Sequence, residues 1–342
     1  MAKTANQARI AIDVLAAQAA TQRLSASVFP RSSLRAMGSR WVPAFAGRHG
    51  KRPSPETAMI QSARPRGVFS PVLTPFTDGY APDAERLVRH CRWLIEQGVG
   101  LAVFGTNSEA NSLSLDEKRA LLDRLLEAGI PPDRLMPGTG ACALPDAIAL
   151  TRHAVAAGCA GVLMLPPFYY KGVSDDGLFR AFAQVIEAVG EGSGNKRLRI
   201  YLYHIPAVSQ VPLGLDLIDR LLSAYPGIVA GIKDSSGDLA NTRAMIERFG
   251  ARGFDVFAGT EAILLETMRA GGAGCITATG NVNPGPIVDL YDNWQAPDAD
   301  ARQAALNRTR AAFQQFPMIA AMKEAIAVRE RRRRPGARCG RR

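Results

Sequence analysis

The chain has 342 residues, and 47% of them are hydrophobic, which is enough for one large α/β barrel or for two ordinary domains. The formal net charge is +11, but residues 1–58 and 329–342 each contribute +7, so the body between them has a net charge of −3. The basic charge therefore lies at the two ends, and we expect no nucleic-acid binding by the body. The sequence contains no apolar run of about 18 residues, so we expect no membrane-spanning helix.

Residues 1–58 are poor in acidic residues and rich in Ala, Ser and Arg, and they show no sustained helix or strand period. One interpretation is a transit-type peptide. The other, which we favour, is a disordered or non-native extension with the natural start at Met59, because the body needs nothing from this segment.

Short apolar runs recur along the body. They are four to eight residues long and rich in Val, Ile, Leu or Ala, which is typical of parallel strands that are buried on both faces. The eight runs are VFSPVLT from residue 68, LAVFGT from 101, RLMPGTG from 134, GVLMLP from 161, RIYLYHIP from 199, GIVAGIKD from 227, FDVFAG from 254 and AGCITATG from 273.

Amphipathic helical patterns separate these runs. Ser114 and Glu117 form a capping-box pattern at the start of a leucine-rich stripe that ends at Gly129. An earlier apolar stripe begins at Leu87 and ends at Gly98. Further helices are expected over about 144–157, 175–189, 213–224, 238–249, 260–270 and 284–294.

Eight consecutive strand–helix pairs favour a closed (β/α)8 TIM barrel of the α/β class, and an open doubly wound sheet is the alternative. We assign the catalytic barrel to residues 59–296. Residues 297–328 are predicted to form a short C-terminal helical extension that is incomplete, and residues 329–342 form a basic tail.

The cysteines are scattered, odd in number and without C-x-x-C spacing, and the four histidines have no metal-ligand spacing. We therefore expect no disulfide framework and no metal site, and a reducing, cytoplasmic location. The five cysteines are Cys91, Cys142, Cys159, Cys275 and Cys339.

We look for catalytic residues at the ends of the predicted strands, because reactive side chains in such barrels lie at the carboxyl ends of the strands. Lys233 comes near the end of the sixth apolar run. Burial disfavours the charged ammonium, and a neutral amine can attack a carbonyl to form an imine that acts as an electron sink. The plainer alternative is a structural lysine paired with a neighbouring acid.

Two tyrosines, Tyr201 and Tyr203, lie on the preceding strand. A tyrosine hydroxyl near Lys233 could relay a proton to the substrate. Strand alternation puts both tyrosines on the same face, so spacing alone does not choose between them. A core tyrosine with a satisfied hydroxyl is the plainer alternative for either residue.

A polar turn that contains Thr106 and Asn107 follows the second run and precedes a helix. Its backbone N–H groups and hydroxyls could bind a carboxylate. A polar loop without a ligand is the alternative.

Five segments together resemble the dihydrodipicolinate synthase / N-acetylneuraminate lyase family, over about residues 66–328. One motif would be weak evidence, but five in the right order and spacing are specific. The resemblance implies a class I, pyruvate-dependent lyase that forms a Schiff base. The segments are GTNSEANSLSLDEKRALL, LPPFYYKG, YHIPAVS, GIKDSSGD, and AGTE followed by AGGAGCITATGNV.

The resemblance also implies roles for the chemical groups. Lys233 would form the Schiff base, and Tyr203 rather than Tyr201 would relay the proton. Thr106 would link Tyr203 to Tyr169, which would reach in from a neighbouring subunit.

Substrate binding and assembly follow from the same resemblance. The backbone amides of Thr106 and Asn107 would hold the carboxylate of pyruvate, and Gly259 and Ile276 would line the site. No metal or organic cofactor is expected, because the lysine itself supplies the electron sink. A homodimer or homotetramer is expected.

Four positions depart from the family pattern, and one of them is His204, which replaces the usual Asn. Asn107 and Ser108 replace a Thr and a Gly of the polar turn. Val208 stands where the synthase carries an Arg that binds the carboxylate of its aldehyde substrate, and a valine cannot make that contact.

We therefore predict a lyase, either an aldolase or a dehydratase, that acts on pyruvate or on 2-oxo sugar acids. The enzymatic alternative is a true 4-hydroxy-tetrahydrodipicolinate synthase, which condenses pyruvate with aspartate semialdehyde. The alternative of another class is a catalytically silent barrel that binds a 2-oxo acid.

Overall fold

The computed structural model describes residues 64–191 and 198–333. The extension predicted over residues 1–58 lies outside the described residues, as do the last nine residues of the predicted basic tail. The first five residues of that predicted tail, 329–333, belong to a helix.

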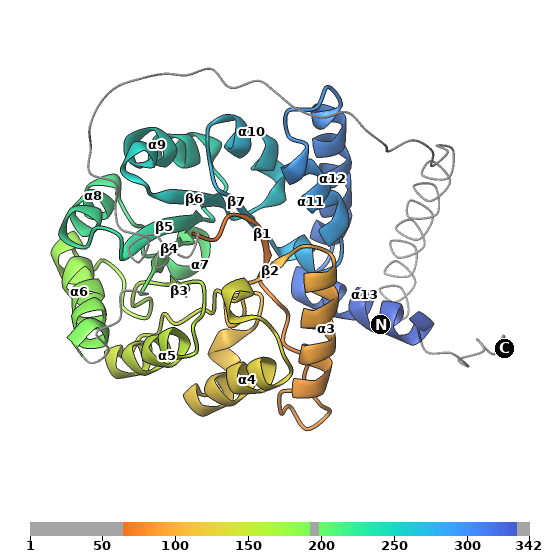
Figure 1. Cartoon of the computed structure of the whole chain (residues 1–342), viewed down its shortest axis with the longest axis horizontal. Coiled ribbons are helices and arrows are strands. Elements are labelled where there is room, and N and C mark those ends of the chain that lie inside the picture. Colours follow the sequence, from red (N-terminus) through yellow and green to blue (C-terminus); the bar gives the residue numbers. More distant parts are fainter. Residues whose placement is uncertain (1–63, 192–197, 334–342) are drawn as a thin grey trace, which may run out of the picture. The chain divides into compact units, whose positions relative to one another are not determined.

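Short parallel strands form the centre of the barrel (Figure 1). In the described part of the chain they make a seven-stranded sheet in the order β2-β1-β7-β6-β5-β4-β3. Their bounds are Gly67–Ser70 for β1, Gly100–Leu101 for β2, Val162–Met164 for β3, Ile200–His204 for β4, Val229–Asp234 for β5, Asp255–Ala258 for β6 and Gly274–Ile276 for β7.

The third predicted strand is not a regular strand, yet it occupies the eighth position of the ring. Leu135 bridges β2 at Leu101, and Gly138 bridges β3 at Leu163, both in parallel. Because β2 and β3 are the two ends of the seven-stranded order, these bridges close the sheet on itself. Pro137 lies between the bridges and has no N–H to donate, which prevents a continuous ladder there. The closed barrel is therefore confirmed, and the open sheet is excluded.

Apart from the short α7 (Pro206–Ser209), which lies over the ring in this view, helices surround the strands on the outside of the ring (Figure 1). The helices of the barrel are α3 Ala84–Glu96, α4 Leu115–Glu127, α5 Leu144–Ala156, α6 Asp175–Glu191, α7 Pro206–Ser209, α8 Leu215–Ala224, α9 Leu239–Phe249, α10 Leu264–Arg269 and α11 Pro284–Asp292.

The start of α4 illustrates how the local sequence sets an element. The side chain of Ser114 accepts a hydrogen bond from the backbone N–H of Glu117, and the Glu117 carboxylate accepts one from the Ser114 N–H. This reciprocal capping box satisfies two N–H groups that the first helical turn leaves without partners. The predicted capping box is thus confirmed.

The hydrophobic core has two layers. The outer layer lies between the strands and the helices and contains residues such as Leu125, Leu217 and Ile232. The inner layer fills the barrel and takes residues from every strand or its flank, together with one residue from the closing segment. Its members are Phe69, Ala102, Met136, Leu163, Tyr201, Ala230, Phe257, Ala273 and Ile276.

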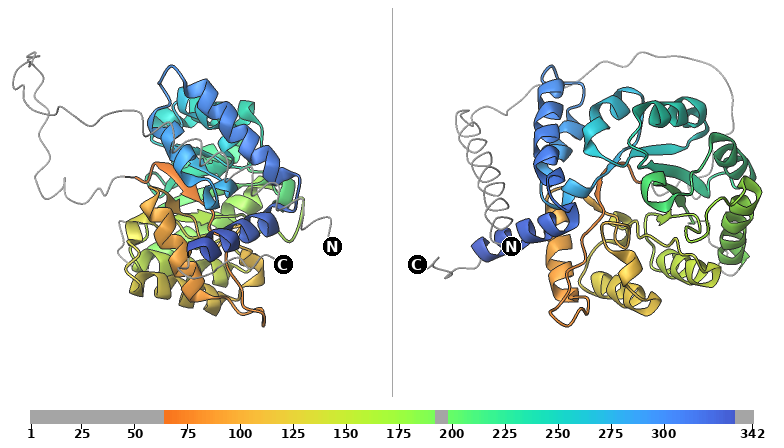
Figure 2. Two further views of the ribbon diagram at one scale, coloured as in Figure 1. Left: turned by 90° about the vertical axis from the view of Figure 1, so that its right-hand side faces the viewer. Right: turned by 180° about the vertical axis from the view of Figure 1, so that it is seen from behind.

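Two helices follow the barrel, α12 over Ala299–Gln314 and α13 over Met318–Arg333. The views in Figures 1 and 2 agree in placing α13 beside α3. The guanidinium of Arg329 in α13 lies 3.4 Å from the centre of the Trp93 ring in α3. The C-terminal helices therefore pack on the barrel.

Candidate active site

Lys233 lies near the carboxyl end of β5 and is only 3% exposed. A register shift against β4 precedes it, because Ile200 pairs with Val229 whereas the next residue, Tyr201, pairs with Gly231. Such a bulge adds one residue and reverses which face the following side chains occupy. The bulge therefore puts Lys233 opposite Tyr203.

Gly231 makes this bulge possible. A Cβ atom at this position would lie 2.2 Å from the backbone oxygen of Asp255 and 2.8 Å from the ring of Tyr201. No side chain fits in that space, so β5 can approach both neighbouring strands only with a glycine there.

Tyr203 is the immediate neighbour of Lys233. The Lys233 Nζ atom lies 4.1 Å from the centre of the Tyr203 ring. The Tyr203 hydroxyl lies 3.2 Å from the Oγ1 atom of Thr106, within hydrogen-bond reach. The structure therefore brings three of the predicted site residues together at the carboxyl ends of β2, β4 and β5.

The surroundings of Tyr203 change its acidity. Burial raises the pKa of the phenol, but the positive charge of Lys233 and hydrogen bonds with Thr106, Lys233 and Ser235 outweigh that effect. The net result is a Tyr203 pKa below its ordinary value. A phenol that ionises more easily is better able to exchange a proton with a substrate.

Tyr201 has a different environment, although it lies on the same face of β4. It is fully buried in the inner layer of the core, with its ring 5.7 Å from that of Phe257. Tyr201 is a packing residue one layer below Tyr203. Depth in the barrel therefore separates two tyrosines that spacing could not separate.

The acid next to Lys233 is fully engaged elsewhere. The Asp234 carboxylate accepts hydrogen bonds from the Ser236 N–H at 3.0 Å, the Asn241 amide at 3.1 Å and the Thr242 hydroxyl at 2.6 Å. Within the described residues, no ion pair joins Lys233 to a carboxylate. The alternative of a structural lysine paired with its neighbour therefore has no support.

His204 faces away from the site on the other side of β4. Its Nδ1 atom accepts a hydrogen bond of 3.1 Å from the backbone N–H of Leu213. Burial lowers the pKa of His204, and the nearby Asp234 opposes that shift without cancelling it. The imidazole is therefore held neutral and fixes the segment after α7.

The polar turn after β2 is half-buried at Thr106 and Asn107. The backbone oxygen of Ser108 accepts a hydrogen bond of 2.7 Å from the Thr74 hydroxyl. Ser108 does not have a positive φ, so its position does not require glycine, whereas Glu109 adopts the left-handed conformation with φ 55°. A cavity of about 120 Å³ lies over this turn, with Thr106 and Tyr203 in its wall.

The remaining predicted residues lie at different distances from this centre. The Gly259 N–H donates a 2.6 Å hydrogen bond to the backbone oxygen of Asp234, which places Gly259 next to the strand end that carries Lys233. Ile276 is fully buried in the inner layer. Tyr169 is 72% exposed and Val208 is 61% exposed, and no contact joins either side chain to Lys233. Their predicted roles remain predictions.

Three residues of the site were missed in the sequence. Ser235 contributes to the acidity of Tyr203, and its position two residues after Lys233 was the available signal. Gly231 could have been found as an isolated glycine inside an apolar strand, which indicates a bulge or a close backbone approach. Glu109 carried no such signal, because its partner Lys323 lies more than 200 residues away in the sequence.

Among residues 64–191 and 198–333, no group of three or more His, Cys, Asp or Glu side chains could hold a metal ion. No helix in the same part of the chain is long and apolar enough to span a membrane.

Comparisons with known proteins agree with this geometry. The dihydrodipicolinate synthetase family matches residues 64–338. An uncharacterized DapA-like lyase of Chloroflexus aurantiacus is 33% identical over 77% of this chain and 87% of its own length. The crystal structure of dihydrodipicolinate synthase from Agrobacterium tumefaciens has 31% identity and a TM-score of 0.69, covering 77% of this chain and 88% of that protein.

A second solved structure has a bound small molecule. YagE, a prophage protein of the dihydrodipicolinic acid synthase family from E. coli K12, was solved in complex with pyruvate. It is 30% identical, with a TM-score of 0.69, and the match covers 77% of this chain and 88% of YagE.

A closed barrel with a buried lysine and tyrosine at the carboxyl ends of its strands can support a lyase that works through a Schiff base. This chain belongs to the dihydrodipicolinate synthetase family. It is an enzyme, a Schiff-base-forming lyase of the dihydrodipicolinate synthase type. Members of this family are generally oligomers that bind small molecules.

Proposed function

We propose that this lyase cleaves or dehydrates a 2-oxo sugar acid and that Lys233 carries the imine. The main support for this proposal is the buried Lys233 amine. It has no ion pair with a carboxylate among the described residues and lies 4.1 Å from the centre of the Tyr203 ring. A buried amine in this setting can act as a nucleophile toward a carbonyl.

The chemistry begins with the neutral amine of Lys233. It adds to the C2 carbonyl of the 2-oxo acid, and loss of water gives a protonated imine. In aldol cleavage the hydroxyl on C4 loses its proton to Tyr203, the C3–C4 bond breaks, and the fragment that carries C4 leaves as an aldehyde. The imine takes up the electron pair of the broken bond to become an enamine. Protonation at C3 and hydrolysis then release pyruvate and consume one water.

In dehydration, the proton on C3 is removed instead and the hydroxyl on C4 leaves as water. The lowered pKa of Tyr203 supports its role as the group that accepts and returns the proton. The hydrogen bond to Thr106 gives the proton a second oxygen to share.

Substrate recognition is proposed at two places. Backbone amides of Thr106 and Asn107 bind the carboxylate, as a polar turn of this kind can do. At the other end of the substrate, Val208 is exposed and apolar. It offers no charge to a second carboxylate, which favours a sugar acid with hydroxyls on its distal carbons.

The direct test is reductive trapping. Wild-type protein incubated with pyruvate and borohydride is expected to gain one reduced pyruvate adduct on Lys233, located by peptide mass spectrometry, and Lys233→Ala is expected to gain none. Lys118 is the comparison lysine, because burial lowers its pKa although it lies on α4 outside the site. An adduct on Lys118, or none on Lys233, contradicts the mechanism.

A second candidate function is the synthase reaction named for the Agrobacterium tumefaciens relative. A coupled assay with pyruvate and aspartate semialdehyde, run beside a panel of 2-oxo sugar acids, separates the two. We expect turnover of a sugar acid and little or no condensation. An adduct on Lys233 without turnover of any compound would instead indicate a silent 2-oxo-acid-binding barrel.

We also propose a homodimer or homotetramer. The exposure of Tyr169 and Tyr170 supports this, because two aromatic rings that are each more than 70% exposed are suited to an interface between subunits. A reducing compartment remains our proposal for location. It is supported by Cys91, Cys159 and Cys275, which are buried as free thiols.

A further inference from the structure

The C-terminal helix α13 touches the turn that is proposed to bind the carboxylate. The ammonium of Lys323 in α13 pairs with the carboxylate of Glu109, and both side chains are 30% exposed. The same ammonium lies 4.7 Å from the centre of the Phe76 ring, which comes from the loop after β1. A residue from the end of the chain therefore reaches the polar turn after β2.

Glu109 is an unusual place for such a contact. Its φ of 55° lies in the left-handed region, which is strained for residues other than glycine. The Glu109 N–H donates to the backbone oxygen of Thr106 at 3.1 Å, so the conformation of Glu109 and the position of Thr106 are linked. A charge pair on Glu109 therefore acts on the geometry of the turn.

The helix that carries Lys323 is itself fixed to the barrel. Six residues further along α13, which is about 9 Å along the helix axis, Arg329 stacks on Trp93 and donates to Nδ1 of His90 at 3.2 Å. The other ring nitrogen of His90 donates to Asn281 at 3.0 Å. This second contact holds α13 in the place from which Lys323 reaches Glu109.

We propose that Lys323 is a positioning residue for substrate binding. Through Glu109 it holds the turn in the conformation in which the amides of Thr106 and Asn107 receive the substrate carboxylate. This inference rests on the proposed function. The contacts of Lys323 are with Glu109 and Phe76 and do not include Lys233. We therefore expect it to act on affinity for the 2-oxo acid and to leave the imine chemistry unchanged.

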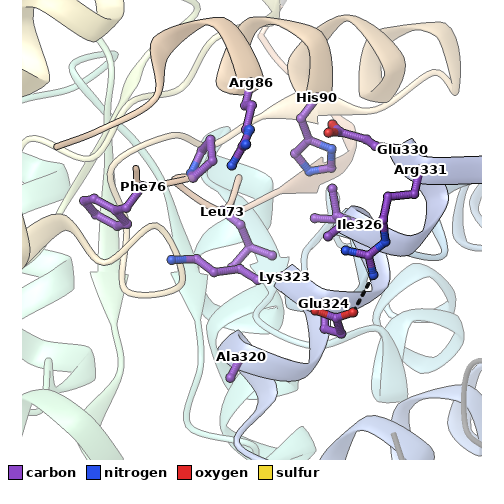
Figure 3. Close-up of a pocket in the computed structure, with 12 residues that line it drawn as sticks. Leu73, Phe76, Arg86, His90, Ala320, Lys323, Glu324, Ile326, Glu330 and Arg331 are labelled. Atoms are coloured by element: carbon purple, nitrogen blue, oxygen red, sulfur yellow. Dashed lines mark hydrogen bonds and ion pairs between the residues drawn. The ribbon is translucent and has the colours of Figure 1, made fainter. Parts of the chain in front are cut away.

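The surroundings of Lys323 allow an unusually direct experiment. Lys323 lines a cavity of about 630 Å³ between α13, α3 and the loop after β1 (Figure 3). In Figure 3 its side chain points toward Phe76, whereas Glu324 of the same helix pairs with Arg331. A small amine can therefore enter the space that a shortened side chain leaves.

The measurement is the pyruvate concentration that gives half-maximal borohydride-trapped adduct on Lys233. We expect Lys323→Met to raise this concentration by roughly twofold to fivefold, in line with a partly exposed ion pair, while the maximal yield of adduct stays at the wild-type level. Lys323→Arg is expected to keep the wild-type value. Arg331→Gln is the matched control, because it breaks an ion pair of the same helix that does not touch the turn.

Two further variants separate positioning from a general loss of structure. Glu109→Gln combined with Lys323→Met is expected to be no worse than the more affected single variant, since both remove the same interaction. Lys323→Ala is expected to regain pyruvate affinity when ethylammonium is added, whereas Glu109→Gln is not.

Each other outcome overturns the inference. An unchanged half-maximal concentration in Lys323→Met, an equal loss in Arg331→Gln, or no response of Lys323→Ala to the amine removes the positioning role while the proposed function stands. Absence of any adduct in the wild-type protein removes the proposed function and this inference with it.

Discussion

The hydroxyl of Thr106 is one of the groups that lower the pKa of Tyr203. Thr106→Val removes that hydrogen bond at nearly constant volume, so the pKa of Tyr203 should rise. The limb of the pH–rate profile that reports Tyr203 is then expected to move to higher pH, and turnover to fall by roughly a hundredfold or less, within the range of a general acid–base group.

The pH–rate profile of the purified variant checks this prediction. Thr106→Ser keeps a hydroxyl and should restore the wild-type limb. Thr151→Val is a control, because it breaks a buried bond of 3.0 Å to Thr139 without touching Tyr203. A profile that does not move in Thr106→Val would show that this hydrogen bond does not control the phenol.

For single residues, the sequence predicted which side chains take part in the chemistry better than it predicted where those side chains lie. Lys233 stood out because few charged residues come directly after an apolar strand. The choice between Tyr201 and Tyr203 needed the family resemblance, since alternation describes the face of a strand and not the depth in a barrel. Glu109 and Lys323 could not be paired from the sequence, because their contact depends on where α13 packs.

The alignment of β5 with β4 depends on one residue, Gly231, which lies at the bulge. Gly231→Ala places a Cβ atom 2.2 Å from the Asp255 oxygen, so the strands must separate or the register must slip. We expect destabilisation by about 1–3 kcal/mol and a loss of pyruvate trapping that exceeds the loss of folded protein.

Urea unfolding and reductive trapping on the same samples test this prediction. Gly250→Ala is a control, because the nearest atom to its Cβ is a side-chain carbon of Ile246 at 3.9 Å. If Gly231→Ala traps pyruvate like the wild type, the close approach of the strands is not needed for the site.

The contact between α13 and the barrel predicts sensitivity to acid. Burial lowers the pKa of His90 from 6.5 to about 4, with the nearby Arg329 adding to the shift and the hydrogen bond with Asn281 opposing it. The unfolded chain therefore binds a proton that the folded chain excludes. The stabilisation is complete above about pH 6.5 and is lost as the pH falls toward 4, by at most about 3 kcal/mol.

The free energy of unfolding, measured in urea at about pH 7.5 and about pH 4.5, should fall more steeply for the wild type than for His90→Gln. His153→Gln is the matched control, because His153 is less buried and pairs with Asp123 at the surface. If the free energy of unfolding falls equally with pH in the wild type and in His90→Gln, His90 is not the source of the acid sensitivity.

Most strands and helices were predictable from the sequence, because their apolar residues fall at the positions that pack into the outer or the inner layer of the core. The exception is the third strand, where Pro137 lies in a run that satisfies the buried pattern but has no N–H to donate to a ladder. Periodicity describes burial, and burial alone does not distinguish a strand from an extended segment held by isolated bridges.

At the scale of the whole molecule, the proposed role of Tyr169 predicts sites that are shared between subunits. Lys233→Ala and Tyr169→Phe are each expected to lose most activity. Mixing the two variants under conditions that exchange subunits should restore activity to about a quarter of the wild-type sites, because half the pairs are mixed and each mixed pair has one intact site.

A mixture of Lys233→Ala with Thr106→Val is the matched control. Thr106 contacts Tyr203 within one chain, so exchange of subunits should give no such gain. Restoration in neither mixture would place Tyr169 in the site of its own chain or outside the site. The sequence predicts this role of Tyr169 only through the family resemblance, because the surface that Tyr169 would contact belongs to a second copy of the chain.

The closing segment of the barrel has a consequence for motion. Between β2 and β3 the ring depends on isolated bridges, and a Cβ at Gly138 would meet the backbone oxygen of Phe104 at 2.2 Å. Met136 and Gly138 donate to the β2 side and Thr139 donates to Leu163, but Pro137 between them has no N–H to donate. We therefore expect this seam to exchange its amide hydrogens with solvent before the regular ladders of the wall. The seam borders the turn that carries Thr106. We therefore expect local opening of the barrel wall to be coupled to access of the substrate carboxylate to the backbone amides of that turn.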